Sequence, residues 1–272
     1  MMVEGALGFS EFATFAVELA REAGAVATAR AFESADSKQV EFKTGPDNLV
    51  TQADRDVEQV IVTGIRQRYP GHGLIGEEGS RLAGDEFRWI IDPIDGTINF
   101  VHGLPWFAVS LALARGDWLV VGVVYRPAGD ELFVAERGAG AFLVEPGGRT
   151  RRLGVSSAAR LEECLIGVGL PAHPARSRVS PLLAQLSDLS RELRILGSAA
   201  LHLADVAAGR LEAFVEPDLR AWDIAAGIVL VEEAGGRATD FAGAPLSGMT
   251  GGDVLASNGR VHDALLGVVR RR

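Results

Sequence analysis

Residues 89–100 read Trp89-Ile90-Ile91-Asp92-Pro93-Ile94-Asp95-Gly96-Thr97-Ile98-Asn99-Phe100, an apolar run followed by a cluster of polar side chains. The opening Trp-Ile-Ile is typical of a buried strand. We expect this strand to stop at Asp92, because Pro93 has a fixed backbone angle and no amide hydrogen to donate to a neighbouring strand.

The polar residues of this stretch have a spacing that suits a binding site. Asp92 and Asp95 are three residues apart, so their carboxylates converge if the chain turns towards a helix. Gly96 leaves room for a ligand beside the backbone, and Thr97 adds a hydroxyl where the unpaired N–H groups of a helix start favour an anion. Carboxylates for a hard cation beside amides for a phosphate indicate metal-assisted phosphate chemistry.

The composition is that of an ordinary globular protein, with 47% hydrophobic and 23% charged residues in a chain of 272. The net charge of −9 argues against a nucleic-acid partner, which normally requires a basic face. No apolar run approaches the ~18 residues of a membrane span, and the acidic N-terminus does not resemble a signal peptide. The single cysteine, Cys164, suits a reducing compartment and fits a buried core position. We therefore expect a cytoplasmic protein without membrane contact.

Hydrophobic periodicity predicts helices and strands along the whole chain. Helices are expected at about 10–32, 51–69, 180–191, 199–208, 222–235 and from 261. Further strands are expected at 73–76, 107–114, 119–125, 131–135, 165–168, 211–215 and 255–257. Those between 107 and 135 look like antiparallel hairpins, and Gly147-Gly148 is taken as the boundary between two halves. Alternation of helix and strand in the second half indicates a layered α/β architecture.

Several acidic residues can be explained either by a structural role or by a functional one. Asp54 and Thr51 match a capping box at the start of a helix, and Asp223 at another helix start complements the helix dipole. Glu77 and Glu78 follow a short strand and are either solvated or part of a site. These alternatives remain open from the residues alone.

The sequence does not match the motifs of two other classes of phosphate-binding protein. No Gly-x4-Gly-Lys-Ser/Thr run occurs, which excludes a P-loop nucleotide site. Haloacid-dehalogenase-type phosphatases use an Asp-x-Asp-x-Thr motif with a covalent aspartate. Here two residues, Pro93 and Ile94, separate the aspartates, and that spacing does not place nucleophile and acid on one turn.

The chain resembles the inositol monophosphatase family of magnesium-dependent, lithium-sensitive phosphatases. The resemblance rests on three motifs in order: Ile75-Gly76-Glu77-Glu78, the stretch from Asp92 to Phe100, and Trp222-Asp223-Ile224-Ala225-Ala226-Gly227 with Glu233-Ala234-Gly235-Gly236. It implies one domain over 1–272 with an α/β fold of alternating helix and sheet layers, an αβαβα sandwich of the inositol monophosphatase and fructose-1,6-bisphosphatase type. The half 1–147 would carry the metal and phosphate motifs, and the half 148–272 the substrate contacts.

The resemblance implies two main metal sites. Glu77, Asp92 and the backbone carbonyl of Ile94 are similar to the ligands of the tightest Mg²⁺. Asp92, Asp95 and Asp223 are similar to those of the second. Clustered carboxylates would repel one another strongly without metal, which suits an acidic protein that binds an acidic substrate.

Other residues of these motifs would orient the attacking water or bind the phosphate. By resemblance, Thr97 and Asp54 orient the attacking water, and the backbone around Gly96 and Thr97 holds the phosphate. Glu78 would support a third, looser Mg²⁺. Lys43 would lie on a mobile loop near the metals, where Asn48 replaces the family's usual acid.

Substrate contacts are expected from the second half. Gly197, Ser198, Ala199 and Glu216, together with Asp223, align with positions that face the substrate's hydroxyl groups. Glu216 suits sugar hydroxyls, which makes inositol monophosphate the leading substrate. Relatives with these motifs cleave histidinol phosphate, fructose 1,6-bisphosphate or adenosine 3′,5′-bisphosphate. The family is typically dimeric, so we expect a homodimer, and a non-catalytic regulatory or binding protein on this fold is the alternative of another class.

Overall fold

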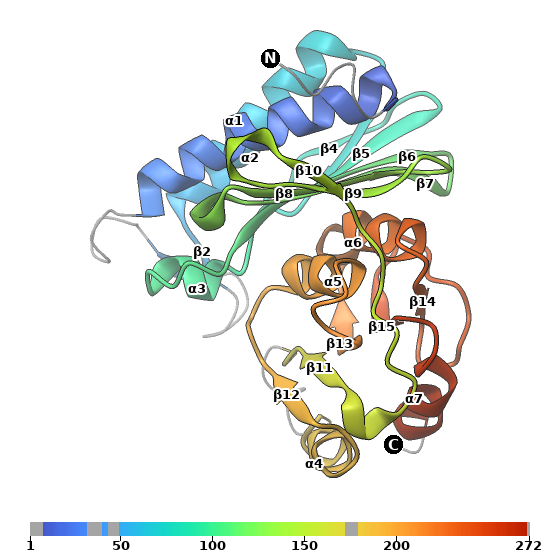
Figure 1. Ribbon diagram of the computed structural model, residues 1–272. Helices are drawn as coiled ribbons and strands as arrows, with labels where there is room; N and C mark the ends of the chain where they lie inside the picture. The colour runs from blue at the N-terminus through green and yellow to red at the C-terminus, as the bar shows by residue number, and fades with distance from the viewer. Residues whose placement is uncertain (1–7, 32–39, 43–48, 172–178, 271–272) are drawn as a thin grey trace.

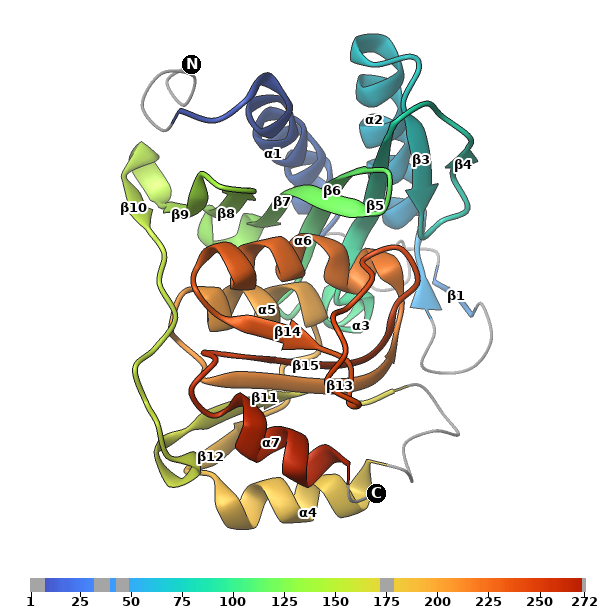
Figure 2. The same cartoon turned by 90° about the vertical axis from the view of Figure 1, so that its right-hand side faces the viewer.

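A computed structural model describes residues 8–31, 40–42, 49–171 and 179–270. Lys43 and Asn48, expected near the metals, lie outside the described residues. The described elements form five layers, in which two sheets alternate with pairs of helices (Figures 1 and 2). The helices of these layers are α1 (Glu11–Ala31), α2 (Gln52–Arg68), α4 (Ser180–Leu189), α5 (Ala199–Ala207), α6 (Ala221–Glu233) and α7 (His262–Val269). The expected αβαβα sandwich is confirmed.

The first sheet has eight strands in the order β10-β9-β8-β7-β6-β5-β3-β4 and is covered by α1 and α2 on its outer face (Figure 1). Its strands are β3 (Gly73–Gly76), β4 (Arg81–Leu82), β5 (Phe87–Asp95), β6 (Ala108–Arg115), β7 (Trp118–Arg126), β8 (Glu131–Glu136), β9 (Gly140–Val144) and β10 (Thr150–Arg152). The hairpins expected between 107 and 135 are confirmed. Because β10 pairs with β9, this sheet continues beyond Gly147-Gly148, and the division into halves there stays a prediction.

The second sheet has five strands in the order β12-β11-β13-β15-β14. They are β11 (Leu165–Val168), β12 (Glu192–Arg194), β13 (Ala213–Leu219), β14 (Arg237–Thr239) and β15 (Gly252–Ser257). β11 runs parallel to β12 and β13, whereas β15 is antiparallel to β13 and β14. A small antiparallel pair, β1 (Glu41–Phe42) with β2 (Leu49–Val50), precedes α2.

The strand that begins at Phe87 does not stop at Asp92, so that expectation is wrong. β5 continues to Asp95, and its register against β6 shifts between Asp92 and Asp95. The irregularity accommodates Pro93, whose missing N–H would interrupt a regular ladder. The strand expected at 211–215 is observed as β13 over Ala213–Leu219, so it continues past Val215 and includes Glu216.

Helices α5 and α6 fill the layer between the two sheets (Figure 2). Both are apolar on nearly every side, because sheets cover them above and below. Two glycines permit the close packing: a Cβ at Gly122 of β7 would lie 2.4 Å from the carbonyl oxygen of Ala226, and one at Gly227 would lie 2.4 Å from Leu203. The position of α6, and hence of Asp223, is therefore fixed by backbone contact with the first sheet.

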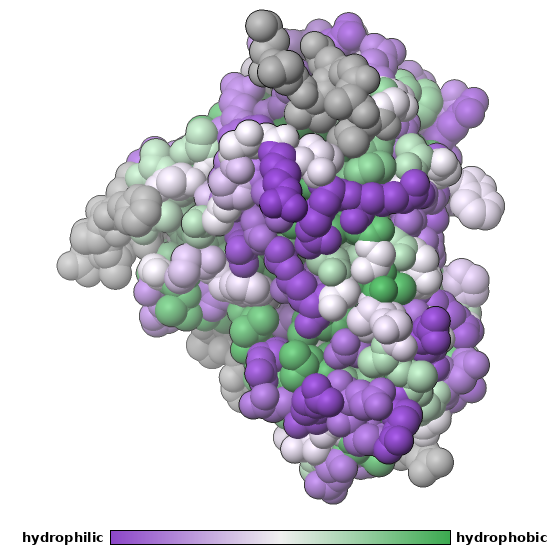
Figure 3. Space-filling model, in the orientation of Figure 1, coloured by the Kyte–Doolittle hydropathy of each residue, from purple (hydrophilic) through white to green (hydrophobic). Residues whose placement is uncertain are grey.

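Figure 3 shows polar residues over much of one face, with apolar residues scattered between them. Cys164 is buried, as expected. Among the described helices, none combines the length and the apolar character that crossing a membrane would require.

Candidate metal centre and substrate cavity

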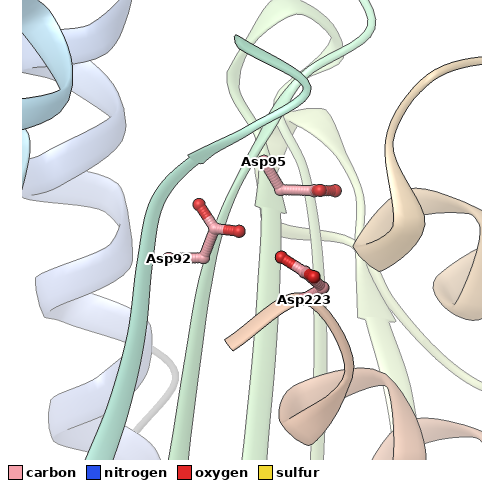
Figure 4. A group of neighbouring side chains, drawn as sticks. All are labelled: Asp92, Asp95 and Asp223. Atoms are coloured by element: carbon pink, nitrogen blue, oxygen red, sulfur yellow. The ribbon is translucent and has the colours of Figure 1, made fainter. Parts of the chain in front are cut away.

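Three aspartates from two distant segments of the chain lie close together. Asp92 and Asp95 come from the end of β5 and Asp223 from the first turn of α6, and their side chains point towards one another (Figure 4). One carboxylate oxygen of each lies within 4.8 Å of those of the other two. The convergence expected for Asp92 and Asp95 is therefore present, with Asp223 added from the second half.

The donor set fits a hard divalent cation. Oδ1 of Asp92 is buried and has no hydrogen-bond partner in the described part of the chain. Burial raises the pKa of Asp92 well above its usual value, and the charges of Glu77, Asp95 and Asp223 raise it further. The pKa of Asp223 is raised for the same reasons, first burial and then the charges of Asp95 and Glu77. Gathered carboxylates with an unused buried oxygen are what a cation such as Mg²⁺ would satisfy.

Asp95 is held in place by the start of α5. It accepts hydrogen bonds from the backbone N–H groups of Ala199 at 3.3 Å and Ala200 at 2.8 Å, and from the Ser198 hydroxyl. Ser198 also caps α5, because its Oγ accepts from the N–H of Leu201 at 3.2 Å. Burial raises the pKa of Asp95 to about 6, and these donors oppose the rise by favouring the charged form.

Asp54 acts as a helix cap and also faces Thr97, so the cap does not exclude a second contact for this carboxylate. Its Oδ2 accepts from the backbone N–H of Thr51 at 2.7 Å and from the hydroxyl at 2.6 Å, which completes the capping box of α2. The Thr97 hydroxyl lies 3.4 Å from Asp54 Oδ1 and 3.0 Å from the carbonyl oxygen of Ile94. Burial raises the pKa of Asp54 to about 7, with smaller contributions from the charges of Glu78 and Glu77.

Glu77 follows β3, which runs parallel to β5 with Gly76 paired to Ile91, and its charge acts on Asp92 from there. Its backbone N–H donates to the carbonyl of Ile91 at 3.2 Å. The turn after Glu77 is held by Glu58 of α2, a buried carboxylate that accepts from the N–H groups of Glu78 at 2.9 Å and Ser80 at 3.1 Å. Sequence reasoning missed Glu58, although its position four residues after Asp54 on the buried face of α2 was an available signal.

Just after the turn that follows β5 lies Asn99, a second residue whose role sequence reasoning missed. Gly96 has φ of +94°, and a Cβ there would lie 2.9 Å from the Trp106 carbonyl oxygen. Asn99 follows on α3 (Thr97–Val101) and donates from Nδ2 to the carbonyls of Trp106 at 2.8 Å and Leu196 at 2.7 Å. Asn99 thus joins this turn to the segment that leads into α5, a role visible only in the folded chain.

An open cavity of about 340 Å³ lies beside Asp95 and Asp223, which both line it. Its lining residues come from both halves: Glu77, Asp95, Gly96, Thr97, Ile98, Asn99, Gly169, Leu170, Ile195, Gly197, Ser198, Ala199, Glu216, Leu219 and Asp223. The expected substrate contacts all line this space. Burial raises the pKa of Glu216 well above its usual value, and the charges of Asp223 and Asp95 add to the shift.

Residues 9–272 match the family model for the inositol monophosphatase family. The chain belongs to this family. It is 43% identical over 260 residues to the inositol-1-monophosphatase of Mesorhizobium japonicum, covering 94% of each chain. It is 41% identical over 259 residues to the Nus factor SuhB of Escherichia coli, again covering 94% of each.

The fold agrees with this membership. The structure of the extragenic suppressor protein SuhB from Bartonella henselae superposes with a TM-score of 0.89 at 38% identity, over 96% of this chain and 99% of that one. The inositol monophosphatase family is generally metal-dependent, in keeping with the acidic cluster of Asp92, Asp95 and Asp223.

Proposed function

We propose that the chain is a Mg²⁺-dependent phosphatase that hydrolyses a small phosphate monoester, with inositol monophosphate as the leading substrate. The observation that supports this most directly is the meeting of Asp92, Asp95 and Asp223 beside an open cavity, with one buried oxygen of Asp92 left without a hydrogen-bond partner in the described residues. We expect two or three Mg²⁺ ions, inhibition by lithium, and a cytoplasmic homodimer.

In this proposal the metals are held by Glu77, Asp92, Asp95, Asp223 and the carbonyl of Ile94, with Glu78 supporting a third site. Bound Mg²⁺ supplies charge neutralisation of the phosphate, activation of water and stabilisation of the leaving oxygen. The location of Glu77 beside β5, and its contribution to the raised pKa of Asp92, support its inclusion.

The remaining groups bind and orient. The Thr97 hydroxyl and the Asp54 carboxylate lie 3.4 Å apart, close enough for one attacking water to contact both, and the backbone of Gly96 and Thr97 offers N–H groups to the phosphate. Glu216 presents a carboxylate on the cavity wall as an acceptor for substrate hydroxyls. No covalent intermediate with the chain is required.

Phosphate release from a substrate panel, with and without Mg²⁺, tests this function. The panel contains inositol 1-phosphate, histidinol phosphate, fructose 1,6-bisphosphate and adenosine 3′,5′-bisphosphate, which covers the alternatives for the same chemistry. We expect Mg²⁺-dependent release, fastest from inositol 1-phosphate. Release from none of them would contradict the phosphatase proposal.

A regulatory or binding role is the second candidate, and one observation favours it: a relative at 41% identity carries the name Nus factor SuhB. The absence of a nucleic-acid partner therefore stays a prediction. If the protein has this regulatory or binding role, the Asp223→Asn variant should keep the biological role in a complementation assay. Loss of that role in the variant would favour the enzyme.

A further inference from the structure

Gly169 lies directly against the carboxylate of Glu216. It follows β11, and its N–H donates to the carbonyl of Val215 on the neighbouring strand β13 at 3.1 Å. A Cβ at Gly169 would lie 1.6 Å from Oε2 and 1.9 Å from Cδ of Glu216. The Glu216 carboxylate therefore occupies the space that any side chain at position 169 would need.

The backbone does not require glycine here. The glycines of the described chain with positive φ do not include Gly169, so alanine can adopt its backbone conformation without strain. The role of Gly169 is to leave space, and an added methyl group would act on Glu216 through steric contact alone. Glu216 can relieve that contact only by moving its carboxylate within the cavity or out of it.

The Glu216 carboxylate is open to a ligand. It lines the cavity and makes no hydrogen bond or ion pair with the described part of the chain. The same cavity is also lined by three apolar side chains, Leu219 and the partly exposed Leu170 and Ile195. A cavity with a carboxylate and apolar side chains suits a cyclic polyol, which offers hydroxyls at its edge and C–H groups on its face.

We propose that Gly169 is a specificity-determining residue, which keeps Glu216 at the position where its carboxylate accepts hydrogen bonds from a polyol phosphate. This inference rests on the proposed phosphatase function and deepens it. It assigns the selection of the alcohol part of the substrate to the pair Gly169 and Glu216, whereas the aspartates act on the phosphate that all substrates share.

The Gly169→Ala variant tests the inference with two substrates. One is the polyol phosphate of the panel that the wild type cleaves fastest; the other is p-nitrophenyl phosphate, which has no hydroxyl for Glu216. We expect the ratio of kcat/KM for the polyol phosphate over p-nitrophenyl phosphate to fall about ten-fold, mainly through a higher KM for the polyol, since a hydrogen bond to a charged group is lost.

Three further variants make the result specific. Glu216→Ala should lower the same ratio by a similar factor, and adding Gly169→Ala to it should cause little further change, because both act through one carboxylate. Gly154→Ala is the matched control, since its Cβ would have no atom within 4 Å, and it should keep the wild-type ratio. Thermal unfolding checks that each variant folds.

An unchanged ratio in Gly169→Ala, or a full additional loss in the double variant, would overturn the inference while leaving the phosphatase function standing. A wild type that cleaves p-nitrophenyl phosphate but no polyol phosphate would overturn it as well. A wild type that cleaves neither substrate would contradict the proposed function itself, and the inference would fall with it.

Discussion

We expect the Asp92→Asn substitution to stabilise the metal-free protein and to abolish its stabilisation by Mg²⁺. Asp92 is buried beside Asp95 and Asp223, and one of its oxygens has no hydrogen-bond partner among the described residues. An asparagine of the same shape removes one negative charge and brings an amide that donates to a neighbouring carboxylate. The same change removes a proposed ligand of both metals.

The size of the effect follows from the separation of the carboxylates. Two full charges 4.8 Å apart repel by about 3 kcal/mol at an effective dielectric constant of ~20. Proton uptake relieves part of this repulsion, since the pKa of Asp92 is raised, so we expect a gain of about 1–3 kcal/mol without metal. With Mg²⁺ at about 100 times its dissociation constant, the wild type should gain about 2.7 kcal/mol and the variant much less.

Urea denaturation at pH 8, in EDTA and in saturating Mg²⁺, measures both quantities through the fluorescence of the buried Trp89. Asp117→Asn is the control, because it removes one negative charge from an exposed turn between β6 and β7. The reasoning is refuted if Asp92→Asn is less stable than the wild type in EDTA, or if Mg²⁺ stabilises it as much as the wild type.

Three further substitutions test the support of the site and the acid stability of the fold. Asn99→Asp removes the two N–H donors to the Trp106 and Leu196 carbonyls, so we expect a loss of about 2–4 kcal/mol in unfolding free energy and weaker Mg²⁺ binding by calorimetry. Gly122→Ala puts a methyl group against α6, and we expect a loss of about 1–3 kcal/mol and, from the displaced Asp223, a lower Mg²⁺ affinity. Burial lowers the pKa of His202 from its ordinary value of 6.5 to about 4, so the unfolded chain binds more protons and stability falls as the pH falls from 6.5 to 4. His202→Phe should flatten that fall by up to about 3 kcal/mol, and unchanged acid unfolding would contradict it.

Local spacing was enough to predict the centre of the site but not its supports. The spacing of Asp92 and Asp95 and the turn that follows them are local features. The sequence alone was therefore enough to predict that the two carboxylates converge. The end of β5 was predicted wrongly, because the bulge that tolerates Pro93 depends on pairing with β6. The contacts of Glu58 and Asn99 could not be predicted, because their partners lie 20 and 97 residues away; helical spacing could place Glu58 on the buried face of α2 but could not name its partner.

A helix cap does not exclude a site role for the same carboxylate, so the two explanations that the sequence left open are compatible. A carboxylate has two oxygens, and a cap occupies one of them. Oδ2 of Asp54 accepts hydrogen bonds from Thr51, and Oδ1 faces the hydroxyl of Thr97. Asp223 accepts the N–H of Arg220 at 2.6 Å with Oδ2, and the same carboxylate contributes an oxygen to the acidic cluster. Capping therefore fixes the orientation of each acid before any metal arrives.

Three helix starts converge on the acidic centre in this way. Asp54 lies in the first turn of α2 and Asp223 in the first turn of α6, and Asp95 accepts from the first N–H groups of α5. The N-terminus of a helix carries a partial positive charge of roughly half a unit, which favours nearby carboxylates by about 0.3–1 kcal/mol each. These terms offset part of the repulsion among the acids, so the fold can assemble the centre without metal and still retain a strong preference for cations.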